Sequence, residues 1–204
     1  MSRFPILVFE GIDGTGKTYH INKVKKYLKK KKIKFVSIRE PGGSKNSEKI
    51  RKLLLSKRNN FHKLSDLFLY IASRNENVEL IKKTVKSKLV LIDRFVDSTI
   101  AYQHYGQKIN YNLINLFHKL ILKNIKITHT FLHTINRKNL NLRLKFKKKD
   151  RYDSFNLNFY HRVQKGYLKL TKKNLEKYTI VNSNLSNKNK ENLIKNKINK
   201  ILKI

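Results

Sequence analysis

The chain has 204 residues, of which 39% are hydrophobic, enough for one α/β domain with a substantial core and too few for two comfortable domains. It has no cysteine, which excludes a disulfide framework and any cysteine-ligated metal. The chain has 48 Lys and Arg against 13 Asp and Glu, which gives a net charge of +35. This charge could serve binding to nucleic acid or to an acidic membrane surface, or it could result from a coding bias toward Lys, Asn and Ile. We favour the coding bias.

Apolar runs and helical periodicities alternate along the chain. The run FPILVF at 4–9 predicts a strand buried on both faces, and the apolar spacing that follows predicts a helix over 17–31. Further strands are predicted at 33–38, 88–92, 127–132 and 178–182, and further helices at 46–57, 64–86, 110–123, 154–176 and the Lys- and Asn-rich end. Right-handed crossovers between such elements predict an α/β fold, with a five-stranded parallel sheet flanked by helices in a single domain over 1–204.

Polar residues follow most of the predicted strands. A glycine-rich loop follows the first strand, and the segments 39–41, 93–94 and 182–183 lie at the ends of three others. Ligands in such folds bind beyond the carboxyl ends of the strands, so these residues should converge on one side. No run reaches ~18 uninterrupted apolar residues, so we expect no transmembrane helix.

The glycine-rich loop at 11–18, GIDGTGKT, matches GxxxxGK[ST] without a gap. Backbone N–H groups of such a loop wrap the phosphates of a bound nucleotide, while Lys17 bridges its β- and γ-phosphates and Thr18 ligates Mg²⁺. Asp93, at the end of KLVLID, has the position of a second Mg²⁺ ligand. The sequence therefore predicts a P-loop NTPase-type fold with ATP bound by Gly11, Ile12, Asp13, Gly14, Thr15, Gly16, Lys17 and Thr18.

Four further segments narrow this prediction. FEGIDGTGKT at 9–18, REPGG at 39–43, YIASR at 70–74 and DRFVDSTIAYQ at 93–103 follow one another at a spacing that closely resembles bacterial thymidylate kinase, a family of P-loop nucleoside-monophosphate kinases. The resemblance implies transfer of the γ-phosphate of ATP to dTMP, giving dTDP and ADP for dTTP synthesis. It also implies a homodimer. The composition and the short apolar start of the chain fit a cytoplasmic enzyme, and we expect no specific nucleic-acid or membrane partner.

The resemblance assigns the phosphate and sugar of dTMP to particular residues. Asp13 would accept a hydrogen bond from the deoxyribose 3′-hydroxyl. Arg94 and Arg51 would hold the acceptor phosphate, because guanidinium groups suit phosphate oxygens. Arg39 or Glu40 would shape the same corner.

The resemblance also assigns residues to the base and the sugar of dTMP. Tyr70 stands where the family usually has Phe stacked on thymine, and Arg74 would donate to a base carbonyl. Tyr102 would pack against the sugar and disfavour a 2′-hydroxyl. The polar edge of the base would be met by Ser98, Thr99 and Gln103.

The basic segment 136–152 resembles the family's short mobile lid, which closes over ATP. The phosphate loop carries Thr15 where some members have a basic residue, so positive charge for phosphoryl transfer must come from elsewhere. In the lid we favour Arg143, with Arg151 as the alternative, and we expect adenine near 182–184. The predicted catalytic residues are Lys17, Arg94 and Arg143.

Two other functions remain open. A kinase for another nucleotide or deoxynucleoside shares the phosphate loop, although Arg51 and Arg94 would be needed only for an acceptor that already carries a phosphate. A basic nucleic-acid-binding protein with a vestigial nucleotide site would explain the charge, but not the intact Lys17 and Asp93. His133 and Asn182 stand where the family usually has Asp, and we expect His133 to be structural.

Overall fold

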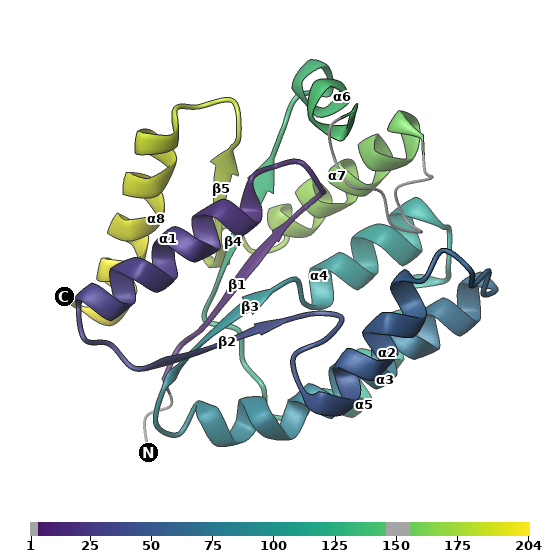
Figure 1. The fold of residues 1–204 in the computed structure, drawn as a ribbon, viewed down its shortest axis with the longest axis horizontal. Coiled ribbons are helices and arrows are strands. Elements are labelled where there is room, and N and C mark those ends of the chain that lie inside the picture. Colours follow the sequence, from purple (N-terminus) through teal and green to yellow (C-terminus); the bar gives the residue numbers. More distant parts are fainter. Residues whose placement is uncertain (1–3, 146–155) are drawn as a thin grey trace.

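The computed structural model describes residues 4–145 and 156–204. Its sheet is fully parallel, with the strand order β2-β3-β1-β4-β5, and helices cover both faces (Figure 1). The strands are β1 (Ile6–Gly11), β2 (Phe35–Arg39), β3 (Leu89–Asp93), β4 (His129–Thr134) and β5 (Tyr178–Asn182). The predicted fold class is confirmed, and β1 and β4 each extend further toward the carboxyl edge than the sequence predicted.

The predicted helices appear in the predicted order, and further helical segments lie between them. They are α1 (Lys17–Lys30), α2 (Lys45–Leu55), α3 (Lys63–Thr84), α4 (Val96–Thr99), the π-helix η1 (Ile100–Gly106), α5 (Tyr111–Ile121), α6 (Arg137–Lys145), α7 (Leu157–Lys172), the 3₁₀ turn η3 (Leu175–Lys177) and α8 (Asn187–Leu202). The prediction of one helix over 154–176 was wrong at its C-terminal end, and residues 154 and 155 lie outside the described residues. The Asn156 side chain accepts from Phe159 N and so starts α7, and the chain leaves α7 after Lys172 for η3.

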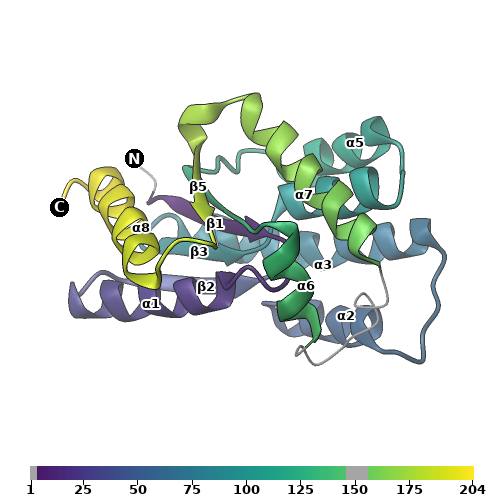
Figure 2. The ribbon, with the colours of Figure 1, turned by 90° about the horizontal axis from the view of Figure 1, so that it is seen from above.

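Alternation along β1 sends its side chains into two separate layers. Leu7 and Phe9 pack in a cluster with residues of α1 and α8, and Ile6 and Val8 pack with residues of α3 on the opposite face. Figure 1 and Figure 2 show α1 and α8 side by side on one side of the sheet, away from α3 and α7. Both faces of the central strand are therefore buried, as its continuous apolar run predicts.

The parallel register brings the carboxyl ends of the strands to one edge, and the backbone there is unusual. Gly11 at the end of β1 has φ of 137°, and a Cβ at this position would lie 2.4 Å from the carbonyl oxygen of His133 on β4. Only glycine fits this close approach. Arg94, directly after β3, has φ of 67°, a left-handed conformation that costs a non-glycine residue about 1–3 kcal/mol. Such conformations cluster at binding and catalytic sites.

Across the described ranges 4–145 and 156–204, none of the helices combines the length and the apolar character that crossing a membrane requires.

Candidate active site

The phosphate loop joins β1 to α1 at the carboxyl edge. The Ile12 and Thr15 side chains are both buried, and the Thr15 hydroxyl donates to the carbonyl oxygen of Ile12 at 2.8 Å. These two residues can therefore offer a nucleotide only their backbone groups. Gly16 adopts a left-handed conformation that directs the chain into the first turn of α1, whose N–H groups face the loop. The arrangement provides the backbone cradle that the GxxxxGK[ST] pattern predicts.

Lys17 is the cation that the phosphate loop itself carries, at the start of α1. Its side chain is buried and forms an ion pair with Asp93 at the end of β3. Burial lowers the pKa of Lys17, the nearby charge of Arg94 lowers it further, and Asp93 opposes both. Thr18, the next residue of α1, is exposed. Lys17 thus lies between the phosphate loop and the predicted metal ligand, where a phosphate chain could replace Asp93 as its partner.

Arg94 lies beside the same loop. Its Nη2 donates to Asp13 Oδ1 at 2.7 Å, and its Nη1 donates to the carbonyl oxygen of Gly11 at 2.9 Å. The guanidinium carbon lies 5.2 Å from the centre of the Tyr102 ring, within the range of a cation–π contact. Arg94 and Lys17 follow the neighbouring strands β3 and β1, so the two predicted catalytic cations lie at one site.

Glu10, at the end of β1, is an important residue that the sequence analysis missed. Its fully buried carboxylate accepts from Phe95 N at 2.8 Å, Ser98 N at 3.2 Å, Ser98 Oγ at 2.5 Å and Tyr167 OH at 3.1 Å. These bonds hold the turn that follows Arg94. A single acid at the end of an otherwise apolar strand was the signal that could have identified it, because a buried charge needs hydrogen-bond partners.

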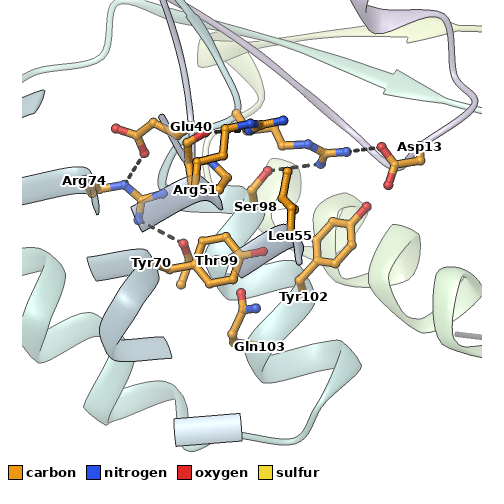
Figure 3. Close-up of a pocket in the computed structure, with 12 residues that line it drawn as sticks. Asp13, Glu40, Arg51, Leu55, Tyr70, Arg74, Ser98, Thr99, Tyr102 and Gln103 are labelled. Atoms are coloured by element: carbon orange, nitrogen blue, oxygen red, sulfur yellow. Dashed lines mark hydrogen bonds and ion pairs between the residues drawn. The ribbon is translucent and has the colours of Figure 1, made fainter. Parts of the chain in front are cut away.

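One cleft gathers every residue predicted to bind dTMP (Figure 3). Its walls are formed by Asp13, Glu40, Arg51, Tyr70, Arg74, Arg94, Ser98, Thr99, Tyr102 and Gln103, together with Pro41 and Leu55. These residues come from the phosphate loop, the loop after β2, helices α2, α3 and α4, the π-helix and the turn after β3. The structure brings the residues together, while their individual roles toward a nucleotide stay predictions.

Arg74 connects the walls of this cleft. It is 2% exposed, and its guanidinium donates to Glu40 Oε2 at 2.6 Å, Thr99 Oγ1 at 2.9 Å and the carbonyl oxygen of Phe95 at 2.8 Å. Its Nη1 also lies 2.7 Å from His118 Nε2, a contact that the sequence analysis did not predict. Burial raises the pKa of Glu40, and the charge of Arg74 opposes that shift. Arg74 is therefore both a cleft residue and the link between α3, the loop after β2, the turn after β3 and α5.

Two other cleft residues meet the space where a ligand would lie. Arg51 reaches over from α2 and donates from Nη1 to the carbonyl oxygen of Pro41 at 2.5 Å. Tyr102 lines the cleft from the π-helix, and its ring lies against the Arg94 guanidinium. Its hydroxyl is buried, so the residue offers the cleft mainly an aromatic surface.

Part of the predicted lid lies directly against the phosphate loop. Residues 137–145 form α6, and Arg143 donates from Nη1 to the carbonyl oxygen of Gly14 at 2.8 Å and from Nη2 to that of Ser183 at 3.4 Å. The Ser183 hydroxyl in turn donates to the carbonyl oxygen of Thr15 at 2.5 Å. Residues 146–152 of the predicted lid, including Arg151, lie outside the described residues. Arg143 and the strand-five loop thus meet at the donor side of the site.

His133, where the family usually has Asp, lies beneath the phosphate loop. Its Nε2 lies 3.2 Å from Nδ1 of His20 on α1, and the two rings stack with centroids 5.1 Å apart. Burial, together with the neighbouring His20, lowers the pKa of His133 to about 3, and burial lowers that of His20 to about 4. Both rings are therefore neutral at ordinary pH. This contact gives His133 a packing role, in keeping with the structural role expected for it.

The two predicted metal ligands suit Mg²⁺ by their chemistry, since a hydroxyl and a carboxylate are hard oxygen donors. Asp93 lies at the end of β3 beside Lys17, and Thr18 is exposed at the start of α1. Within the described ranges, no three His, Cys, Asp or Glu side chains lie together in a group that could hold a metal on its own. A Mg²⁺ ion at this site would therefore need phosphate oxygens or water as further ligands.

Comparison with known proteins gives one consistent family. The model of the family described as thymidylate kinase matches residues 9–194. The thymidylate kinase of Thermosipho africanus is 41% identical, over 81% of this chain and 84% of its own length, and that of Chlorobaculum tepidum is 33% identical, over 89% and 90%. A crystal structure of thymidylate kinase from Ehrlichia chaffeensis superposes with a TM-score of 0.75 at 30% identity and covers 98% of both chains. The chain therefore belongs to the thymidylate kinase family.

Proposed function

We propose that this protein is a dTMP kinase that transfers the γ-phosphate of ATP to dTMP, forming dTDP and ADP in the cytoplasm. The observation that carries the proposal is the cleft in which all ten predicted acceptor residues meet, next to the phosphate loop. Arg94 connects the cleft to the phosphate loop, because it lines the cleft and also contacts Asp13 and Gly11 of the loop. An acceptor phosphate bound to Arg94 would lie beside a donor phosphate bound to Lys17.

Phosphoryl transfer here depends on alignment and charge. The acceptor phosphate oxygen is already ionised, so no strong general base is needed. Lys17 leaves its pairing with Asp93 to bind the donor phosphates, and Arg94 leaves Asp13 to bind the acceptor phosphate. Asp13 then becomes available to the 3′-hydroxyl of the sugar. Arg143 adds positive charge from the donor side, and together these cations neutralise the charge that develops between the nucleotides.

Mg²⁺ would be held by the Thr18 hydroxyl and the Asp93 carboxylate, directly or through water, and would neutralise charge on the donor phosphates when bound.

The acceptor base would lie between α3 and the π-helix. Tyr70 offers an aromatic face for stacking, as in the family's usual Phe, and Gln103 and Thr99 lie next to it in Figure 3. Tyr102 closes the sugar side with its ring, which also lies against the Arg94 guanidinium. This arrangement suits a deoxynucleotide whose base has carbonyl groups, the chemical class to which dTMP belongs.

We propose a homodimer that forms through α3 and α5. Phe68 of α3 and Leu116 and Leu120 of α5 are between 50% and 62% exposed, and Phe68 packs edge-to-face on Phe117. A patch of large exposed apolar side chains on two adjacent helices is typical of a protein–protein interface. The substitution Leu120→Lys should convert the dimer to a monomer in analytical ultracentrifugation. A wild-type protein that sediments as a monomer at micromolar concentration would contradict the proposal.

A coupled assay of ADP formation with dTMP, dUMP, dCMP and dGMP as acceptors tests the function. We expect the highest kcat/KM with dTMP. Preference for dCMP or dGMP would favour a kinase for another nucleotide. No turnover with any acceptor, combined with salt-sensitive binding to nucleic acid, would favour a nucleic-acid-binding protein with a vestigial site.

A further inference from the structure

The side of Arg74 that faces away from Glu40 meets a histidine that no sequence pattern identified. His118 lies on α5, is 5% exposed, and places Nε2 at 2.7 Å from Arg74 Nη1. The same Nη1 donates to Thr99 Oγ1 at 2.9 Å. Because a guanidinium group can only donate, His118 Nε2 must accept, and the proton of a neutral ring must then be on Nδ1. The contact therefore selects one tautomer of His118.

This tautomer carries a cost. In the described part of the chain, His118 Nδ1 is buried and has no hydrogen-bond partner. An unpaired buried N–H is unfavourable, whereas a leucine of similar volume would fill the same space without it. Burial and the adjacent charge of Arg74 lower the pKa of His118 to about 2, so the ring remains an acceptor at any pH at which the protein works. The hydrogen bond that His118 makes in return is the one to Arg74.

Arg74 is held from three directions once His118 is included. Glu40 fixes the Nε edge, the Phe95 carbonyl fixes Nη2, and Thr99 and His118 share Nη1. Without His118, one Nη1 proton loses its acceptor in a buried site, and the guanidinium group can turn toward the cleft. Such a rotation would move the wall against which the acceptor base would lie.

We propose that His118 is a positioning residue for acceptor recognition, which acts by holding the Arg74 guanidinium in place at the base end of the cleft. The proposal rests on the proposed function, in which Arg74 meets the acceptor nucleotide. His118 does not line the cleft, so it acts only through Arg74. It affects binding of the acceptor more than the transfer step, because Lys17 and Arg94 lie at the other end of the site.

The test compares His118→Leu with His118→Gln. Leucine removes the acceptor, and glutamine offers Oε1 near the place of Nε2. For His118→Leu we expect the KM for dTMP to rise about tenfold, as for loss of a hydrogen bond to a charged group, with kcat and the KM for ATP nearly unchanged. His118→Gln should recover most of the loss. If the leucine variant does not fold, His118→Met replaces it as the unbranched apolar substitution.

The matched control is His129→Leu on β4. Like His118, His129 is buried and lies outside the cleft. Its Nε2 lies 2.8 Å from Thr179 Oγ1, so its hydrogen-bond partner is a hydroxyl and not an arginine. We expect its removal to lower the thermal midpoint without changing the KM for dTMP. Unfolding temperatures measured on all variants separate loss of stability from loss of recognition.

Calorimetric titration of dTMP onto the same proteins distinguishes a failure of the proposed dTMP kinase function from a failure of the role proposed for His118. A wild-type protein that binds dTMP but does not phosphorylate it would end the proposed function, while the ratio of Kd values between His118→Leu and wild type would still report on His118. An unchanged Kd and KM in His118→Leu would overturn the inference. So would a His118→Gln variant that folds like the wild type and binds as weakly as the leucine variant.

Discussion

Asp97 on α4 makes the stability of the protein depend on pH in a way that a single substitution should remove. Its carboxylate accepts a hydrogen bond from the Tyr178 hydroxyl at 2.8 Å. Burial, followed by the charge of the neighbouring Glu10, raises the pKa of Asp97 from 3.8 to about 7. The folded protein therefore holds a proton that the unfolded chain releases. The stability associated with that proton is complete below pH 3.8 and is lost as the pH rises through about 7.

The size of the effect follows from this interval. Each pH unit between the two pKa values corresponds to about 1.4 kcal/mol, so the interval from 3.8 to about 7 corresponds to about 4 kcal/mol at most. The side chain keeps some contact with water, which reduces the amount. Asp97→Asn removes the ionisation and keeps an oxygen that can accept from Tyr178. The variant should therefore gain stability over the wild type as the pH rises.

Urea unfolding of both proteins at intervals from pH 5 to pH 8 measures this difference. We expect the advantage of Asp97→Asn to grow through this range by about 1–3 kcal/mol and to level off above the folded pKa. Glu176→Gln, which changes an exposed carboxylate, is the control and should show no such growth. A difference that is constant with pH, or one that shrinks as the pH rises, would refute the reasoning.

Four further substitutions test the site and its packing. Lys17→Ala and Arg94→Ala should each lower kcat/KM in the coupled assay by about 100-fold or more while circular dichroism shows an intact fold, because each removes a cation from the transition state; near-normal turnover of either would contradict the mechanism. Arg143→Ala should raise the KM for ATP more than that for dTMP, since its side chain contacts the phosphate loop, and an unchanged KM for ATP would argue against a donor-side role. Gly166→Ala should lower the free energy of unfolding by about 1–3 kcal/mol in urea unfolding, because a Cβ would lie 2.4 Å from the Tyr105 ring. Alanine is normally the better helix residue, so a more stable variant would show that the ring can move away.

The order of elements and the position of the site could be predicted from the sequence because both follow from short-range patterns. FPILVF is apolar at every position, and the phosphate loop begins two residues after its end, at Gly11. The acceptor residues could be placed only through resemblance to a family, since Tyr70 and Arg74 alone look like residues of an ordinary helix. The structure adds that α3, the loop after β2 and the π-helix bring them to one cleft.

The residues that the sequence analysis missed act through long-range contacts. Glu10 binds a turn more than 80 positions away, and His118 contacts Arg74 across 44 positions. No periodicity or spacing rule connects such pairs. Residues 95–106 had no predicted helix, because four residues of α4 followed by a π-helix do not repeat with the usual helical spacing. The segment 137–145 was recognised by its charge, and its helix was not predicted.

The π-helix makes the acceptor wall sensitive to chain length. Gln107 N donates to the carbonyl oxygen of Tyr102 at 3.0 Å, five positions earlier, so this turn contains one residue more than an α-helical turn. Deleting one residue of the π-helix would allow a regular α-helix, which is the more favourable backbone. Every side chain after the deletion would then rotate by about 100° around the helix axis. If the lost residue precedes Tyr102, both Tyr102 and Gln103 would turn away from the cleft. Loss of one residue here could therefore produce a well-folded protein without an acceptor site, a change that stability measurements alone would fail to detect.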